Sequence, residues 1–180
     1  MAWSTPFTAV SNAVYTAAQH NASVRDNLLE TAPAKVTAAN QLLVGTGANS
    51  IAARTPIAAA VATSQTTTLT GYADLATPGP SVSPVTGTAA LVGIHSAITN
   101  SGAGVSLASF EISGATTLAA ADNVSIGQDA NGGTVTPNTR IGSFHLMTGL
   151  TPGTNTFKMK YRVGSGTGTY VDRKITVVPL

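Results

Sequence analysis

The clearest pattern in the sequence is a strict alternation of apolar and polar side chains near the C-terminus. In the segment NTFKMKYRV, residues 155–163, every second position is apolar, namely Phe157, Met159, Tyr161 and Val163, with basic residues between them. A period of two over eight residues is typical of a β-strand with one buried face. We therefore expect a strand whose apolar residues lie in a core and whose basic residues face solvent.

The segment that follows, TYVDRKITVVP at residues 169–179, alternates in the same way. Its pattern predicts that Val171, Ile175 and Val177 face inward. Arg173 falls on the same side, which predicts either a bulge in the strand or a position at the sheet edge. Because the glycine-rich GSGTG joins the two segments, they are expected to form a terminal antiparallel hairpin.

Five earlier segments are also rich in apolar residues and are bounded by Gly, Pro, Asn and Asp. With the C-terminal pair they give about seven or eight strands, at the spacing of an all-β sandwich or jelly roll. The fold class predicted for this region is therefore mainly β, an antiparallel, jelly-roll-like sandwich. The five segments are TTTLTGYADL, AALVGIHSAIT, VSLASFEIS, DNVSIGQDA and RIGSFHLMTGL.

Residues 1–35 follow a helical rather than a β pattern. Thr16 is a candidate N-cap, and Gln19 stands three residues further on, which is the spacing of a capping box. The stretch behind it, AAQHNASVRDNLLETA, contains no Gly or Pro and is expected to be helical until Ala32-Pro33, since a residue before proline disfavours the α region.

Apolar residues in this region recur by four and three, the spacing of a coiled-coil seam. In such a seam Asn21 is the buried polar residue that fixes register or oligomer number. The alternative is that the same residues pack against the protein's own strands. The positions concerned are Val10, Val14, Ala17, Asn21, Val24 and Leu28.

Short apolar runs and turn signals occupy residues 36–65, between the helical and the β regions. The predicted organisation is thus a helical docking or oligomerisation arm at residues 1–35, a stalk or linker at 36–65, and a β-sandwich domain at 66–180.

Charged residues make up only 9% of the chain, against about 25% in typical soluble domains. So little charge favours a subunit of an assembly over an isolated monomer. Residues 140–180 hold six basic residues against one acid, Asp172, but without the interleaved aromatics of a nucleic-acid site. We read the cluster as the solvated face of two strands. Neither a secretion signal nor an apolar run of about 18 residues occurs, so no membrane role is expected.

The sequence offers no convincing catalytic or metal-binding motif. His20, His95 and His145 are too far apart in sequence to form a zinc motif, and there is no Cys, no nucleophile elbow and no P-loop. The loop from Asp122 to Asn131 carries calcium-type oxygen ligands, although its spacing is not that of an EF-hand. We expect no enzyme, no catalytic residue, no cofactor and no metal.

The N-terminal segment resembles a recurrent segment of bacteriophage virion proteins, in particular minor tail or fibre-type proteins of phages that infect actinobacteria. The likeness is carried by TAAQHNASVRDNLLE and by the later phrase QLLVGTGANSIAAR, and so covers about the first 55 residues. One departure is AVSNAVY, where a Gly-containing turn is usual. The resemblance implies a structural protein at the virion surface, assembled in the host cytoplasm, homotrimeric, and bound to other virion proteins.

Two classes of function remain open. The first is a virion component, either a tail or fibre protein or a capsid decoration or head-fibre protein. The second is an adhesin for host carbohydrate, which needs exposed aromatic residues such as Tyr72 or Tyr170. A glycan-cleaving enzyme is disfavoured because no acid pair is evident. The residues expected at the assembly interface are Val14, Thr16, Ala17, Asn21, Val24, Arg25, Asp26, Asn27 and Leu28.

Overall fold

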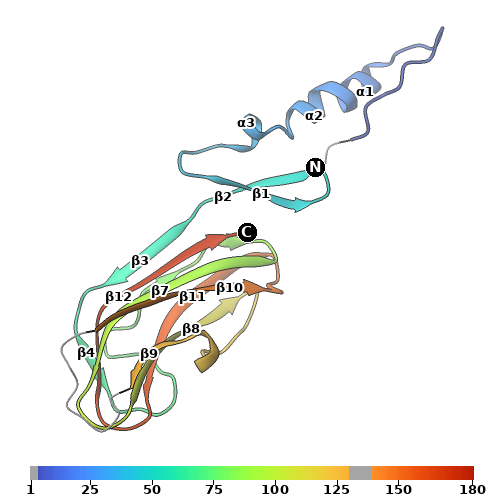
Figure 1. Cartoon of the computed structure of the whole chain (residues 1–180). Coiled ribbons are helices and arrows are strands. Elements are labelled where there is room, and N and C mark those ends of the chain that lie inside the picture. The colour runs from blue at the N-terminus through green and yellow to red at the C-terminus, as the bar shows by residue number, and fades with distance from the viewer. Residues whose placement is uncertain (1–3, 130–138) are drawn as a thin grey trace. The chain divides into compact units, whose positions relative to one another are not determined.

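The computed structural model describes residues 4–129 and 139–180, and the chain divides into two compact units (Figure 1). One unit comprises residues 1–55 with Leu180, and the other comprises Pro56–Pro179. The segment predicted as a stalk, residues 36–65, is therefore divided between the two units.

The first unit contains a continuous helical run over residues 17–28 whose start is set by Thr16. The Thr16 hydroxyl accepts a hydrogen bond from the Gln19 N–H at 3.2 Å, and the Gln19 side-chain oxygen accepts one from the Thr16 N–H at 2.9 Å. The predicted capping box is thus confirmed. The run consists of α1 (Ala17–His20), a π-helical turn η1 (Asn21–Arg25) and α2 (Asp26–Leu28).

The helix ends before the predicted stop at Ala32-Pro33. It finishes at Leu28, and Pro33 lies in the first turn of a separate short helix, α3 (Ala32–Lys35). Proline is tolerated there because an N–H in the first turn has no partner within the helix. Pro33 therefore opens a helix instead of terminating one.

A two-stranded hairpin completes the first unit. It is formed by β1 (Leu42–Gly47) and β2 (Ser50–Arg54), which pair antiparallel. Asn49 in the turn has a φ of 54°, a left-handed conformation that Asn adopts more readily than most residues. None of the residues in these two strands is buried. Two strands without a buried face are marginally stable in water, so the hairpin supplies no core.

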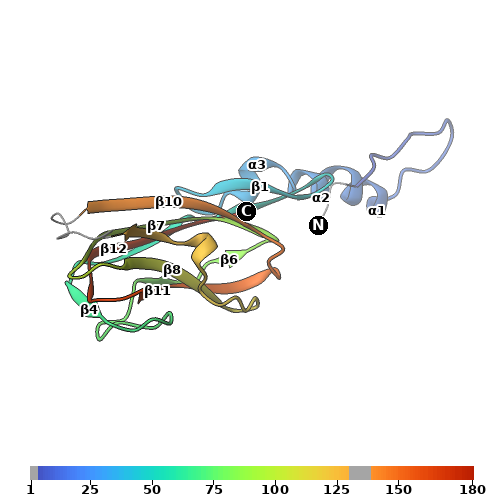
Figure 2. The same ribbon diagram turned by 60° about the horizontal axis from the view of Figure 1, so that its bottom comes forward.

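The second unit is a sandwich of two antiparallel sheets, as the alternating segments predicted (Figure 2). The β7 sheet has the order β10-β7-β12-β3, and the β11 sheet has the order β5-β11-β8-β9. Strand β4 also pairs with β12, and β6 also pairs with β11.

The strands of the β7 sheet are β3 (Ile57–Val61), β4 (Gln65–Thr67), β7 (Ala89–Asn100), β10 (Thr139–Thr148) and β12 (Gly168–Pro179). The strands of the β11 sheet are β5 (Ser81–Val82), β6 (Val85–Thr86), β8 (Val105–Gly114), β9 (Ile126–Asp129) and β11 (Gly153–Val163). A 3₁₀ turn, η2 (Asp122–Val124), precedes β9.

The strand order is that of a jelly roll. Since β3 and β4 share one partner strand, and β5 and β6 share another, the strands of the described residues occupy eight positions. Counted along the chain, the sixth, third, eighth and first positions form one sheet, and the second, seventh, fourth and fifth form the other. The chain thus crosses repeatedly between two sheets. This agrees with the prediction of seven or eight strands.

The core lies between the two sheets and confirms the alternation in β11. Phe157, Met159, Tyr161 and Val163 are fully buried, as predicted. They pack against apolar residues of both sheets. The largest of these are Ile94 and Ile98 on β7, Phe110 and Ile112 on β8, and Tyr170, Ile175 and Val177 on β12.

The prediction that the last two strands form a hairpin was wrong. Strand β11 pairs with β8 and β5, whereas β12 pairs with β7 and β3, so the GSGTG connection crosses from one sheet to the other. The rings of Tyr161 and Tyr170 meet across the core with centroids 4.9 Å apart. Alternation shows which side of a strand is buried but not which strand lies beside it, so both arrangements satisfy the pattern.

A bulge in β12 brings Arg173 inward, which was one of the two predicted alternatives. The register with β7 shifts between Val171 and Lys174, and Asp172 has a φ of 51°. The extra residue reverses the phase of the strand. Tyr170 therefore faces the core before the bulge, and the prediction that Val171 faces inward was wrong, since that side chain is only half-buried.

Candidate assembly surfaces

The arm pairs its helix with the extended segment that precedes it. The Ser4 N–H donates to Asn27 Oδ1 at 2.8 Å, and the Phe7 N–H donates to Ser23 Oγ at 3.1 Å. The rings of Phe7 and Tyr15 pack with centroids 5.2 Å apart. The extended segment before the helix is thus held against it by hydrogen bonds to the polar side chains of Asn27 and Ser23.

Among the described residues of the arm, Asn27 and Glu30 are the buried polar residues. The side-chain amide of Asn27 donates to the carbonyl oxygens of Ser4 and Ser23 at 3.2 and 3.1 Å. Both ends of the amide are therefore bonded within the chain, and Asn27 is 3% exposed. Asn21 is half-buried in the π-helical turn.

The other residues predicted at an assembly interface lie in three settings. Val14 is in the extended lead-in, outside the helix, and is 83% exposed. Arg25 and Asp26 bond one another, with Arg25 Nε 2.8 Å from Asp26 Oδ1. Thr16 caps the helix and Ala17 is exposed beside it.

Large apolar side chains of the arm are left open to solvent. Leu28 is 58% exposed, and Val24 and Leu29 next to it are also exposed. Val10 and Val14 continue this surface only in sequence, because they precede the helix. An exposed apolar surface on a segment that has no hydrophobic core of its own is typical of a segment that packs on a partner.

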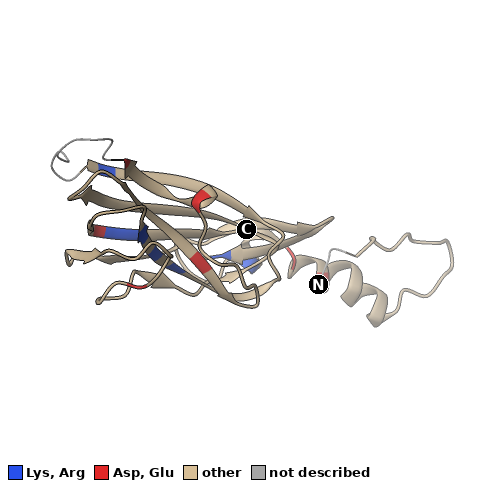
Figure 3. Ribbon diagram, turned by 90° about the horizontal axis from the view of Figure 1, so that it is seen from below, with Lys and Arg blue, Asp and Glu red and all other residues tan. Residues whose placement is uncertain are grey.

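The outer face of the β11 sheet is covered by the protein's own acidic residues. Lys158 Nζ and Lys160 Nζ lie 2.7 and 3.0 Å from Asp74 Oδ2, and Lys160 also lies 3.1 Å from Glu111 Oε1. The prediction of a solvated basic face was thus wrong for β11, where the Lys160 side chain is 14% exposed, whereas Lys174 on β12 is exposed as predicted. Asp74 lies in a loop distant in sequence from β11, and Glu111 lies on the neighbouring strand β8; Figure 3 shows how basic and acidic positions are distributed over the ribbon.

A second group on the same sheet joins β11 to η2. The Arg162 guanidinium pairs with the Asp122 carboxylate and lies 5.5 Å from the centre of the Tyr72 ring. The Tyr72 hydroxyl donates to Asp122 Oδ1 at 2.9 Å. These hydrogen bonds, first that from Arg162, lower the pKa of Asp122. The Asp122 carboxylate, one of the calcium-type ligands noted in this loop, therefore bonds to Arg162 and Tyr72, and Asn131 lies outside the described residues.

Burial raises the pKa of the Asp74 carboxyl, but hydrogen bonds from Lys158 and Lys160 outweigh it and lower the pKa below its usual value. Asp74 and Asp122 thus stay charged to a lower pH than an ordinary aspartate does.

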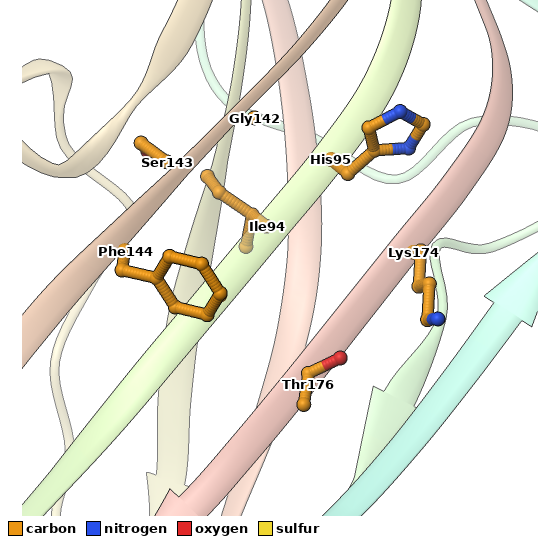
Figure 4. Close-up of a pocket in the computed structure, with 8 residues that line it drawn as sticks. Ile94, His95, Gly142, Ser143, Phe144, Lys174 and Thr176 are labelled. Atoms are coloured by element: carbon orange, nitrogen blue, oxygen red, sulfur yellow. The ribbon is translucent and has the colours of Figure 1, made fainter.

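The outer face of the β7 sheet is apolar by contrast. Phe144 and Leu146 on β10 are 71% and 61% exposed. The Phe144 ring extends over Gly93 of β7, where a side chain would collide with it (Figure 4). Beside the ring is a hollow of about 530 Å³, whose polar lining includes His95, Lys174 and Thr176.

The histidines do not form a metal site in the part of the chain that the structure describes. His95 lies opposite Gly142 and lines the outer hollow, whereas His145 lies opposite Val92 with its ring 6.1 Å from that of Phe110 in the core. The two rings are therefore on opposite faces of the β7 sheet. Burial lowers the pKa of His145.

Sequence reasoning missed Phe144 as the exposed aromatic residue of the sandwich. Tyr170, which it considered exposed, is buried, and its hydroxyl donates to the Arg162 carbonyl at 2.5 Å. In RIGSFHLMTGL both phases of the strand contain large apolar residues, so alternation could not assign the outer face.

Among the described residues, no helix has the length and apolarity to cross a membrane.

No family model matches the sequence, and no curated protein matches it. Among solved structures, the chain is similar to a chain in the structure of the infectious bursal disease virus Gx strain, with a TM-score of 0.42 and 10% sequence identity. The similarity covers 76% of this chain and 36% of that chain. This protein thus spans little more than a third of the length of the chain it matches.

Proposed function

We propose that the protein is a non-enzymatic structural component of a bacteriophage virion, of the minor tail or fibre type. In this proposal the arm attaches the protein to the particle, and the jelly-roll sandwich is displayed at the virion surface. Copies of the chain associate, with a homotrimer as the expected form, and assembly takes place in the host cytoplasm.

The observation that carries this proposal is a difference between the polar and the apolar residues of the arm. Polar residues of the arm that were expected at the assembly interface are bonded inside the chain, as Asn27 is to Ser4 and Arg25 is to Asp26. The apolar residues Val24 and Leu28, by contrast, are exposed. Full burial of one such side chain against a partner stabilises the contact by about 1.5–3 kcal/mol. The exposed apolar residues of the arm therefore supply the free energy for its attachment to the particle.

The acidic residues support a non-enzymatic role. Six of the seven form ion pairs with basic side chains of the same unit, and Asp129, the remaining one, lies at the exposed end of β9. Hydrolysis of a glycan needs two carboxyl groups held about 5–10 Å apart across a substrate, one of which holds a proton near neutral pH. The pKa values of Glu30, Asp74 and Asp122 are lowered, so these acids suit that proton-holding role poorly.

The proposal is tested by incorporation into particles. Leu28→Asp places a charge among the exposed apolar residues of the arm, and Ser11→Asp adds the same charge at an exposed polar position. We expect particles assembled with the Leu28→Asp protein to contain at least about tenfold less of it, and the Ser11→Asp protein to be incorporated normally. Equal incorporation of both variants, with both folded, contradicts attachment through the arm.

Immunogold labelling of whole particles then locates the protein. Label on the tail supports the minor tail or fibre assignment. Label on the head indicates a capsid decoration or head-fibre protein instead. If the particles carry no label and contain no copies of the protein, a virion role is contradicted.

A further inference from the structure

On the outer face of the β7 sheet, the side chains are large along the β10 edge and small toward the β3 edge. In one cross-strand row, Phe144 on β10 is followed by Gly93 on β7, Thr176 on β12 and Ala58 on β3. The Phe144 ring lies over Gly93, and beyond it the row continues with the small side chains of Thr176 and Ala58, which we call the trough. Leu146, two residues further along β10, forms a ridge with Phe144.

We propose that this face is an interface between copies of the chain, in which the Phe144 and Leu146 ridge of one copy enters the trough of the next. Ridge and trough lie on the same sheet, so each copy offers both halves of the contact. A head-to-tail contact of this kind closes into a ring when the rotation between copies is suitable, and a trimer is one such ring.

The charges of this face favour a second copy as the occupant. The rows that contain Phe144 and Leu146 hold no charged side chain, so a neutral, apolar surface fits them best. Lys174, at the end of the trough, forms no ion pair among the described residues. The ridge of a second copy supplies a neutral surface and leaves Lys174 in solvent.

The area is also adequate. Strands β10, β7, β12 and β3 have ten, twelve, twelve and five residues, so at about 3.4 Å per residue and about 4.8 Å between strands they present a face of roughly 640 Å². Specific interfaces bury about 600–1,000 Å² per partner, and the face reaches the lower end of that range. The β11 sheet offers no equivalent, because Asp74 and Asp122 cover its outer face with ion pairs.

The inference rests on the proposed function only in that the protein is an oligomer, and it uses a surface separate from the arm. Sedimentation velocity of the full-length protein over a range of concentrations measures the association. Phe144→Glu and Leu146→Glu each place a charge on the ridge. Val85→Glu is the matched control, an exposed apolar residue on the β11 sheet, and Leu28→Asp tests the arm.

We expect either ridge variant to raise the dissociation constant of the oligomer about tenfold or more, and Val85→Glu to leave it unchanged. Circular dichroism and thermal unfolding establish that each variant is folded. Because Leu146 does not cover Gly93, its variant decides the matter if Phe144→Glu fails to fold.

A wild-type protein that stays monomeric overturns the inference, and so does an oligomer that both ridge variants leave intact. Dissociation by Leu28→Asp alone overturns it while preserving the arm as the contact between copies. A monomer that binds a saccharide on a glycan array, and loses that binding in Leu146→Glu, overturns it in favour of a ligand site. Dissociation by the ridge variants with normal virion incorporation supports it independently of the arm.

Discussion

The two outer faces of the sandwich differ in their side chains and in how far other residues of the chain cover them. The β11 sheet presents basic residues on β11, and acidic residues from loops distant in sequence cover them, as Asp74 covers Lys158 and Lys160. The β7 sheet presents Phe144 and Leu146, which are 71% and 61% exposed among the described residues. The outer face of the β11 sheet is thus covered within the chain, whereas the outer face of the β7 sheet is the one that we propose a second copy covers.

The difference is one of chemistry as well as of coverage. Ion pairs exposed to water contribute little each, about 0–1 kcal/mol, and mainly fix where a loop lies. An exposed aromatic or aliphatic side chain gains about 1.5–3 kcal/mol on full burial. Of the two outer faces of the sandwich, that of the β7 sheet therefore has more free energy to gain from association.

Loss of Arg173 is the most severe test of the covered face. Its guanidinium is buried, donates to the carbonyls of Thr77 and Thr63 at 3.0 and 3.1 Å, and lies 5.4 Å from the centre of the Tyr161 ring. The segment between those carbonyls carries Asp74, so Arg173 anchors the cover from inside.

We expect Arg173→Ala to lower the free energy of unfolding by about 3 kcal/mol, because two charge-assisted hydrogen bonds are lost and a cavity is left. Arg173→Met, which fills more of the space, should lose less. Urea unfolding followed by circular dichroism measures both; an alanine variant as stable as the wild type contradicts the anchoring role.

Removal of the covering charge should have a smaller effect. Asp74→Asn leaves Lys158 and Lys160 without their shared acid, and we expect a loss of about 1 kcal/mol, reduced by the partial exposure of the pair. The loss should shrink as salt is added, since salt screens the remaining repulsion. Asp129→Asn, which removes an acid that is exposed and forms no ion pair among the described residues, is the control and should leave stability unchanged.

Acid should uncover the β11 sheet before it affects the β7 sheet. Because the pKa values of Asp74 and Asp122 are lowered in the folded protein, their pairs contribute stability above the unfolded-chain pKa near 4. That contribution is lost as the pH falls through the lower folded values. Asp122→Asn should therefore flatten the decline of the unfolding temperature below about pH 4; a decline as steep as in the wild type argues against this linkage.

The smallest effect on folding should come from the exposed ridge. Leu146→Ser at a concentration where the protein is monomeric should change the free energy of unfolding by less than about 0.5 kcal/mol, since the side chain is 61% exposed. A loss of several kcal/mol measured by urea unfolding would mean that Leu146 belongs to the core of its own chain.

Local features of the sequence predicted local structure well. The Thr16 and Gln19 spacing placed the start of the helix, because a capping box involves only neighbouring residues. The alternation through Phe157 and Tyr161 identified the buried side of β11, because one face of that strand is consistently apolar.

Long-range features were the ones that sequence reasoning missed. The pairing of β12 with β7 instead of β11 depends on the crossing of the chain between sheets, which no local pattern encodes. The cover over Lys160 comes from Asp74, more than eighty residues earlier. Tyr170 was assigned to the surface because the bulge at Asp172 reverses the phase of its strand.

Hydroxyl-radical footprinting at low and high protein concentration is the most direct test of the difference between the two faces. We predict that Phe144 and Leu146 become protected as concentration rises, in step with the increase in mass, while Val85 on the other sheet stays equally reactive. Unchanged labelling of Phe144 and Leu146 in an oligomeric sample would contradict the assignment of the β7 sheet as the face that a second copy covers.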